Sequence, residues 1–334
     1  YPLTKIESIH FRYSPDGRTK GSGDNAWGRV NKFLGINLLA DKNLWDDFGM
    51  DVAKRLGWPR ESRTSYESSF RLYPSSDYKI AGERVYSATL YCRDWHPSQI
   101  SIMFINKGDY VIPEEDADDA IEEFSDTVEA TADALMERFT AKFGKPDTSR
   151  FGKGGDLKDR LERWDIGDHA FLLSEQDEYV RLLIVPVSMA DNWGRVERVR
   201  DYDIRKRLED RVLERPNGDV IIDQIPMADQ GRKGYCSPAT AERFLRYFGI
   251  QVDMYALARV AKTGFGGGTY SDDLLDAISD IARKNKRTFK RVSMKSEVRD
   301  VSKYIDEGMP IMWTVYSQNN LYHEGINRQS RQRQ

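Results

Sequence analysis

One long amphipathic run between two groups of strand-like segments does most to limit how this chain can fold. From 117 to 143, apolar residues recur at spacings of three and four until Gly144 and Pro146 end the pattern, as expected for a helix with one buried face. Short apolar or alternating runs that predict strands lie on both sides of it, at 78–92, 99–105, 161–166, 170–174 and 179–187. This order of elements favours an antiparallel sheet with the long helix on one face. The predicted fold class is therefore α+β.

Shorter elements fill the rest of the chain. Further helices are predicted at 26–33, 44–56, 201–213, 237–248, 253–261, 272–283 and 297–307, and further strands at 220–225 and 310–316. A polar turn at 215–218 separates the strand-rich part from the helix-rich part, and 334 residues are enough for two hydrophobic cores. We therefore expect an α+β domain of unknown role at 1–215 and a second domain at 219–334.

Charge and cysteine content exclude several classes of function. The formal net charge is −3, with acidic and basic residues interleaved, so we expect no basic face for a nucleic acid. No segment reaches the ~20 consecutive apolar residues that cross a bilayer. The two cysteines, Cys92 and Cys236, stand far apart, which fits neither a disulfide scaffold nor a zinc site.

Two segments that resemble ligand-binding motifs have simpler interpretations. The glycine loop at 264–268 lacks the Gly-Lys-Ser/Thr ending of a phosphate loop, and we interpret it as a turn before a helix capped by Thr269 or Ser271. The acidic run at 114–126 lacks the EF-hand pattern, and acidic residues are favourable at a helix N-terminus. We therefore expect neither a metal nor another cofactor.

The most informative residue is Cys236, which directly precedes the helix predicted at 237–248, with Pro238 in its first turn. Unpaired N–H groups and the helix dipole at such a position favour a negative charge. They favour the thiolate, the form of cysteine that attacks carbonyl carbons. Cys236 is therefore the candidate nucleophile; the alternative interpretation is a structural cysteine that behaves as a small apolar residue.

A glutamine stands at a matching position upstream. Gln230 is followed by a loop that contains Gly231 and Gly234, two residues that allow the chain to fold back sharply. The Gln230 side-chain amide could then point to the same place as the backbone N–H of Cys236. Two such donors would form an oxyanion hole, in which the loss of one donor costs ~2.7–4 kcal/mol of transition-state stabilisation.

This Gln-x5-Cys pattern at a helix start resembles the papain-like cysteine peptidases. With Ile225-Pro226-Met227 before it and Tyr235 beside the cysteine, the wider string resembles cysteine peptidase family thirty-nine, which removes double-glycine leaders, and its stand-alone relatives. The resemblance covers about 219–316. It implies a papain-like α+β domain, truncated at its carboxy end, with Gln230 and Cys236 at catalytic positions. It implies nothing about the first domain.

The resemblance also implies a histidine base and an Asp or Asn that orients it. In the family this histidine begins a strand that follows the one similar to 310–316. His323 precedes polar sequence that predicts no strand. We therefore expect His323 to lie in an insertion loop, the base to follow Gln334, and the fragment by itself to be inactive. His323 as the base is the alternative.

Together these features predict a cysteine-dependent hydrolase whose partner is a peptide or protein substrate. A transferase or amidase on the same fold is a second enzymatic option, and a non-catalytic peptide-binding module is the alternative from another class. The chain begins at Tyr1 rather than Met, which fits a processed chain, and stand-alone members of such families are often exported. We expect a secreted or cell-envelope protein.

Overall fold

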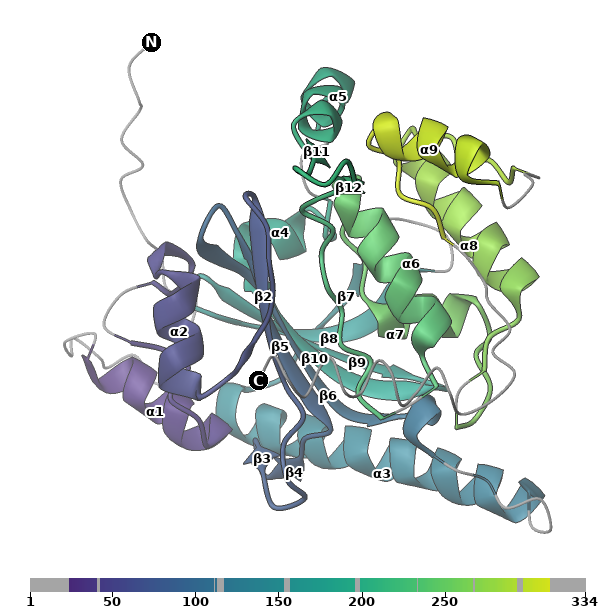
Figure 1. The fold of residues 1–334 in the computed structure, drawn as a ribbon. Helices are drawn as coiled ribbons and strands as arrows, with labels where there is room; N and C mark the ends of the chain where they lie inside the picture. The colour runs from purple at the N-terminus through teal and green to yellow at the C-terminus, as the bar shows by residue number, and fades with distance from the viewer. Residues whose placement is uncertain are drawn as a thin grey trace.

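An eight-stranded antiparallel sheet forms the centre of the computed structural model (Figure 1). The structure describes residues 24–40, 43–110, 112, 117–152, 157–195, 199–232, 234–266, 268–292 and 297–312. In spatial order the strands are β1 (Arg60–Arg63), β2 (Glu67–Leu72), β5 (Ser87–Arg93), β6 (His96–Asn106), β10 (Tyr179–Pro186), β9 (His169–Gln176), β8 (Asp159–Ile166) and β7 (Asp147–Phe151). Together with the helices described below, this sheet confirms the predicted α+β class.

The sheet consists of two antiparallel meanders that pair with each other through β6 and β10, where Ile102 lies opposite Leu182. A two-residue turn joins β5 to β6. Asp94 and Trp95 in this turn have φ angles of 49° and 74°. A type I′ hairpin turn requires positive φ at both of its central residues. The segment 78–92, predicted as one strand, instead contains β5 and a small separate hairpin of β3 (Lys79–Ile80) and β4 (Glu83–Arg84).

One face of the sheet is covered by α1 (Asp24–Leu34), α2 (Gly49–Leu56) and the long helix α3 (Ala117–Phe143) (Figure 1). The bounds of α3 match the sequence prediction. Its buried residues recur at helical spacing: Phe124, Val128, Ala132, Leu135 and Phe139. They pack in one core with Ile100, Ile102 and other residues from this face of the central strands.

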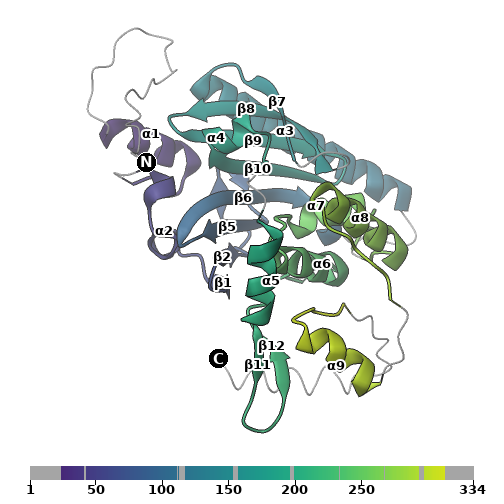
Figure 2. The same ribbon diagram turned by 90° about the horizontal axis from the view of Figure 1, so that it is seen from above.

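The opposite face carries helices from the carboxy-terminal part of the chain. Because side chains alternate along a strand, Met103 of β6 points away from Ile102 and packs with Tyr235 and Tyr255. These two tyrosines belong to the start of α6 (Cys236–Tyr247) and to α7 (Met254–Val260). Figure 2 shows both helices lying over the sheet, on the side away from α3.

The remaining elements lie around this second layer. They are α4 (Val187–Asp191), α5 (Asp201–Glu209), the hairpin of β11 (Val212–Glu214) and β12 (Val220–Ile222), α8 (Ser271–Lys284) and α9 (Val298–Asp306). The helix predicted at 201–213 is therefore too long, since its last residues form β11. The cap predicted for α8 is wrong: Tyr270 is the N-cap and makes no side-chain capping bond. Residues 310–312 form no strand, and the rest of the strand predicted at 310–316 lies outside the described residues.

The turn at 215–218 is the exposed tip of the β11–β12 hairpin. The chain on its two sides meets through the Met103–Tyr235–Tyr255 cluster and through polar contacts between the sheet and α6. The division into domains at 1–215 and 219–334 stays a prediction. Among the residues that the structure describes, no helix is long and apolar enough to span a bilayer.

Candidate active site

The start of α6 places Cys236 at the molecular surface. Cys236 is the first residue of the helix, Pro238 lies in the first turn, and Cys236 is exposed. The preceding residue, Tyr235, is buried, and its hydroxyl accepts a hydrogen bond from the backbone N–H of Gly108 at 3.1 Å. The helix start is thus anchored to the end of β6 while the cysteine remains accessible.

Cys236 and Gln230 line the same cavity, whose volume is about 450 Å³. Its wall is completed by residues of β1, of the loop before α6 and of α6 itself: Arg60, Glu61, Met227, Ala228, Asp229, Ala239, Thr240 and Arg243. The two residues paired from the sequence therefore meet at one opening. Their assignment to catalytic roles stays a prediction.

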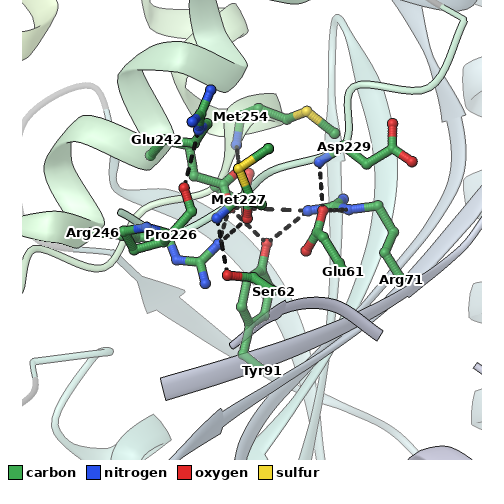
Figure 3. Close-up of polar contacts among 12 residues, drawn as sticks. Glu61, Ser62, Arg71, Tyr91, Pro226, Met227, Asp229, Glu242, Arg246 and Met254 are labelled. Atoms are coloured by element: carbon green, nitrogen blue, oxygen red, sulfur yellow. Dashed lines mark hydrogen bonds and ion pairs between the residues drawn. The ribbon is translucent and has the colours of Figure 1, made fainter. Parts of the chain in front are cut away.

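The loop that carries Gln230 is held by the amino-terminal sheet (Figure 3). Ser62 Oγ of β1 accepts a hydrogen bond from the backbone N–H of Met227 at 2.9 Å. Glu61 Oε1 accepts one from the N–H of Asp229 at 2.6 Å. On the other side of the same residue, the Tyr73 hydroxyl donates to the Asp229 carbonyl at 2.6 Å. The backbone next to Gln230 is thus bound at both polar groups of one residue.

Gly231 shows how closely this loop approaches the sheet. Its φ is +68°, and a Cβ at this position would meet the Tyr73 ring at 2.9 Å. The Asp229 carboxylate accepts a hydrogen bond from the Gly231 N–H at 2.8 Å, which closes a local turn. Only glycine combines this backbone conformation with this contact.

Behind the loop lies a buried network of charged groups that joins β1, β2 and β5 to α6 (Figure 3). Arg71 Nε donates to Glu61 Oε1 at 2.6 Å, and these side chains are 1% and 3% exposed. Glu242 of α6, with no exposed surface, accepts from Arg246 at 3.0 Å and from the Met254 N–H at 2.8 Å. Such groups are stable inside a protein only when paired in this way.

Burial and ion pairing shift the pKa values of Glu242 and Glu61 in opposite directions. Burial raises the pKa of Glu242 to about 7, although the charges of Arg246 and Arg71 oppose this effect. For Glu61 burial acts in the same sense, but the charge and hydrogen bond of Arg71 and the Asp229 N–H outweigh it, so the pKa of Glu61 is lowered. Glu61 therefore stays ionised, and accepts the hydrogen bond from the loop, down to a lower pH than Glu242 does.

The described histidines lie away from this cavity. His96 contacts the Asp47 carbonyl at 3.0 Å, and burial lowers the pKa of His169 to about 4. Neither residue lines the cavity. His323 lies outside the described residues. Across the described part of the chain, no cluster of three or more His, Cys, Asp or Glu is placed to hold a metal ion.

Cys92 occupies the opposite environment from Cys236. It lies in β5, is 2% exposed, and burial raises its pKa to about 12. The two thiols are therefore easily distinguished by chemical accessibility.

Sequence reasoning missed the charged residues of the cavity wall. Arg60 and Glu61 had no local signal, because the bond from Glu61 to the loop spans 168 positions. Arg243 did have one. It follows Cys236 by seven residues, the spacing that returns to the same helix face after two turns.

A comparison with known protein families finds a match in the carboxy-terminal part of the chain. Residues 222–330 match the sequence model of the Peptidase_C39 like family. No curated protein and no solved structure matches the chain. The family match overlaps the segment for which the sequence resemblance was drawn, and it includes Gln230, Cys236 and all of α6. The carboxy-terminal part of this chain thus resembles cysteine peptidase family 39.

Proposed function

We propose that this protein is a cysteine-dependent peptide hydrolase. The observation that carries the proposal is the placement of Cys236, at the start of α6, in one cavity with Gln230. The family match over 222–330 supports a peptidase-like segment. A lone exposed cysteine would not suffice, because helix-start cysteines also occur as inert structural residues.

In the proposed reaction the Cys236 thiolate attacks the carbonyl carbon of a peptide bond and forms a tetrahedral intermediate. The Gln230 side-chain amide and the Cys236 backbone N–H donate to the oxygen that becomes negatively charged. Protonation of the leaving amine and collapse of the intermediate give an acyl-enzyme, which water then hydrolyses to regenerate the thiol.

The reaction needs a base that accepts the thiol proton and returns it to the leaving amine. Within the residues that the structure describes, no histidine lines the cavity. We therefore assign the base to a histidine that follows Gln334, with His323 as the second candidate. For the location of the protein we propose the secreted fraction or the cell envelope.

A peptide-binding module without turnover is the second candidate function. The observation that favours it is the cavity itself, which has a volume of about 450 Å³ and is lined by apolar and charged side chains next to Cys236 and Gln230. Such a module would bind the substrate peptide in the cavity and release it unchanged.

Peptide cleavage by the 334-residue chain, and by a version extended through the next encoded histidine, tests the proposal. Cleavage should require Cys236, so Cys236→Ser should abolish it in whichever chain is active. Gln230→Ala should slow it by about 10²–10³. The matched control is Gln224→Ala, which removes a glutamine of the same loop that bonds Ser65 and does not line the cavity. Binding without cleavage in both chains would favour the module.

If only the extended chain cleaves, the base follows Gln334. If the 334-residue chain is active, His323→Ala decides whether His323 is that base. Loss of cleavage in Gln224→Ala equal to that in Gln230→Ala would contradict an oxyanion role for Gln230.

A further inference from the structure

The wall of the Cys236 cavity carries both positively and negatively charged side chains. Four charged side chains line it: Arg60, Glu61, Asp229 and Arg243. Whether these charges cancel decides what chemical group the cavity accepts next to the thiol.

Glu61 contributes little net charge to the cavity. Its carboxylate is 2.6 Å from Arg71 Nε, and the pair is almost completely buried. At contact distance the two opposite charges cancel for any group farther away. Asp229 is exposed, and its carboxylate already accepts the Gly231 N–H. Its field is therefore screened by solvent, as is that of Arg60, which is also exposed and of opposite charge.

Arg243 is half-buried and differs from the buried arginines of this region. Its Nε donates to the Pro226 carbonyl at 3.0 Å, a neutral acceptor. Its guanidinium forms no ion pair with a carboxylate in the described chain, whereas Arg71 and Arg246 each do. Burial lowers the pKa of Arg243. The guanidinium is partly desolvated, and within the described part of the chain no carboxylate pairs with it.

Arg243 and Cys236 lie on the same wall of the cavity. Arg243 lies two helical turns after Cys236, and both residues line the one cavity. Arg60 of β1 also lines it, is exposed, and has no ion-pair partner in the described chain. A guanidinium presents a planar fork of donors that matches a carboxylate.

We propose that Arg243, assisted by Arg60, forms a carboxylate-binding subsite beside Cys236. The inference rests on the proposed function: the substrate carries an acidic side chain or a free terminal carboxylate close to the bond that is cleaved. A volume of about 450 Å³ is enough for such a residue and its neighbour. The carboxylate supplies the counter-ion that Arg243 does not find among the described residues.

Alkylation of Cys236 tests the subsite without any turnover. The thiolate displaces iodide from both iodoacetate and iodoacetamide and forms a thioether, but only iodoacetate is an anion. The rate constant for iodoacetate divided by that for iodoacetamide at Cys236 therefore reports the local charge. Mapping by peptide mass spectrometry separates Cys236 from buried Cys92.

Arg243→Gln should lower this ratio by about two- to six-fold, as expected for the loss of one charge that lines the same solvent-exposed cavity as the thiol. Arg243→Lys, which keeps the charge, should retain most of the ratio. Arg232→Gln is the matched control. It removes an exposed charge from the loop that carries Gln230, and Arg232 does not line the cavity. A ratio equal in wild type and Arg243→Gln, or lowered as much by Arg232→Gln, overturns the proposal.

Protection of Cys236 from iodoacetamide then distinguishes the two sources of a carboxylate. Three otherwise identical peptides are compared: one with an internal Glu and an amidated end, one with Gln and a free carboxylate, and one with Gln and an amidated end. Stronger protection by the first or the second than by the third, lost in Arg243→Gln, identifies the source. Equal protection by all three overturns the subsite.

These results separate the subsite from the proposed function. Charge-dependent protection in an extended chain that cleaves nothing removes the hydrolase proposal and leaves the subsite standing. Cleavage that depends on Cys236 but is indifferent to the carboxylate leaves the hydrolase and removes the subsite.

Discussion

The carboxylate of Glu61 accepts a hydrogen bond from the backbone N–H of Asp229 at 2.6 Å, across 168 positions of sequence. Asp229 directly precedes Gln230, so a residue of the edge strand β1 restrains the backbone of the proposed oxyanion donor. Arg71 holds the same carboxylate oxygen from β2. The cavity at Cys236 is therefore built jointly by the amino-terminal sheet and by the segment that resembles a peptidase.

Removing Glu61 should destabilise the whole molecule. Glu61→Ala leaves Arg71 buried without its nearest partner, and breaking such a pair costs about 3–5 kcal/mol. Urea denaturation should show a loss of that size in the free energy of unfolding. Glu67→Ala is the control: its partner Arg246 keeps Glu242, so the loss should be near ~1 kcal/mol. Equal losses would mean that the Glu61–Arg71 pair has no special role.

Glu242 should give the unfolding free energy a recognisable pH dependence. Because burial raises its pKa from 4.5 to about 7, the folded state binds more protons than the unfolded state between these values. Its contribution to stability is therefore fully present below about 4.5 and is lost as the pH rises through about 7.

The measurement is the difference in unfolding free energy between wild type and Glu242→Gln, recorded from about pH 4 to about pH 8, a window that spans both pKa values. The difference should fall as the pH rises, because titrations of all other groups cancel. A flat difference would show that the pKa of Glu242 is the same in the folded and unfolded states, and a difference that rises with pH would show that it is lowered on folding.

The two thiols should react very differently with iodoacetamide in the native protein. Cys236 is exposed, whereas Cys92 is buried and burial raises its pKa to about 12. At about pH 8 only about one Cys92 thiol in 10⁴ would be ionised, even if the reagent could reach it. Mass spectrometry should find label on Cys236 alone until denaturant is added. Equal labelling of the two residues in native conditions would show that β5 opens readily.

Gly231→Ala should perturb the loop more than a comparable substitution elsewhere. Both Gly231 and Gly218 have positive φ, but a Cβ at Gly231 would meet the Tyr73 ring at 2.9 Å, while Gly218 has nothing within 4 Å. Backbone strain alone costs about 1–2 kcal/mol, so Gly218→Ala measures that strain. Gly231→Ala should cost more in the free energy of unfolding and should change the iodoacetamide rate at Cys236. Identical costs would contradict the close approach of the loop to Tyr73.

Limited proteolysis should cut the exposed tip of the β11–β12 hairpin at 215–218. The two fragments should stay together in gel filtration, because Tyr235 and Tyr255 pack against Met103 and Arg246 pairs with Glu67. Separation of the fragments without denaturant would show that the two parts of the chain fold and associate independently.

Sequence reasoning worked where one side-chain pattern repeats over many residues. The α3 helix and the strands β8, β9 and β10 emerged close to their observed bounds, since most of their apolar residues pack into the cores on the two faces of the sheet. The strands β1 and β2 were missed because their buried positions include Ser62 and Arg71. Polar residues are buried there because their partners arrive from α6 and its preceding loop.

The same contrast applies to the candidate site. Gln230 and Cys236 were found because both lie within one short string beside a helix start. Glu61 could not be found, since nothing in the strand around it announces a contact with a distant loop. Arg243 was within reach of helical periodicity, and only its lack of an acidic partner needed three-dimensional information.

The chain order of this shared cavity sets the order in which it is made. A ribosome synthesises all eight strands of the sheet, ending with β10 at Pro186, before it reaches Gln230 and Cys236. Domains generally fold from the amino terminus as they emerge, so the wall that contains Arg60 and Glu61 is available before the thiol exists. Cys236 is thus added after the strands that carry this wall, and the nascent chain carries no assembled cavity until α6 has left the ribosome.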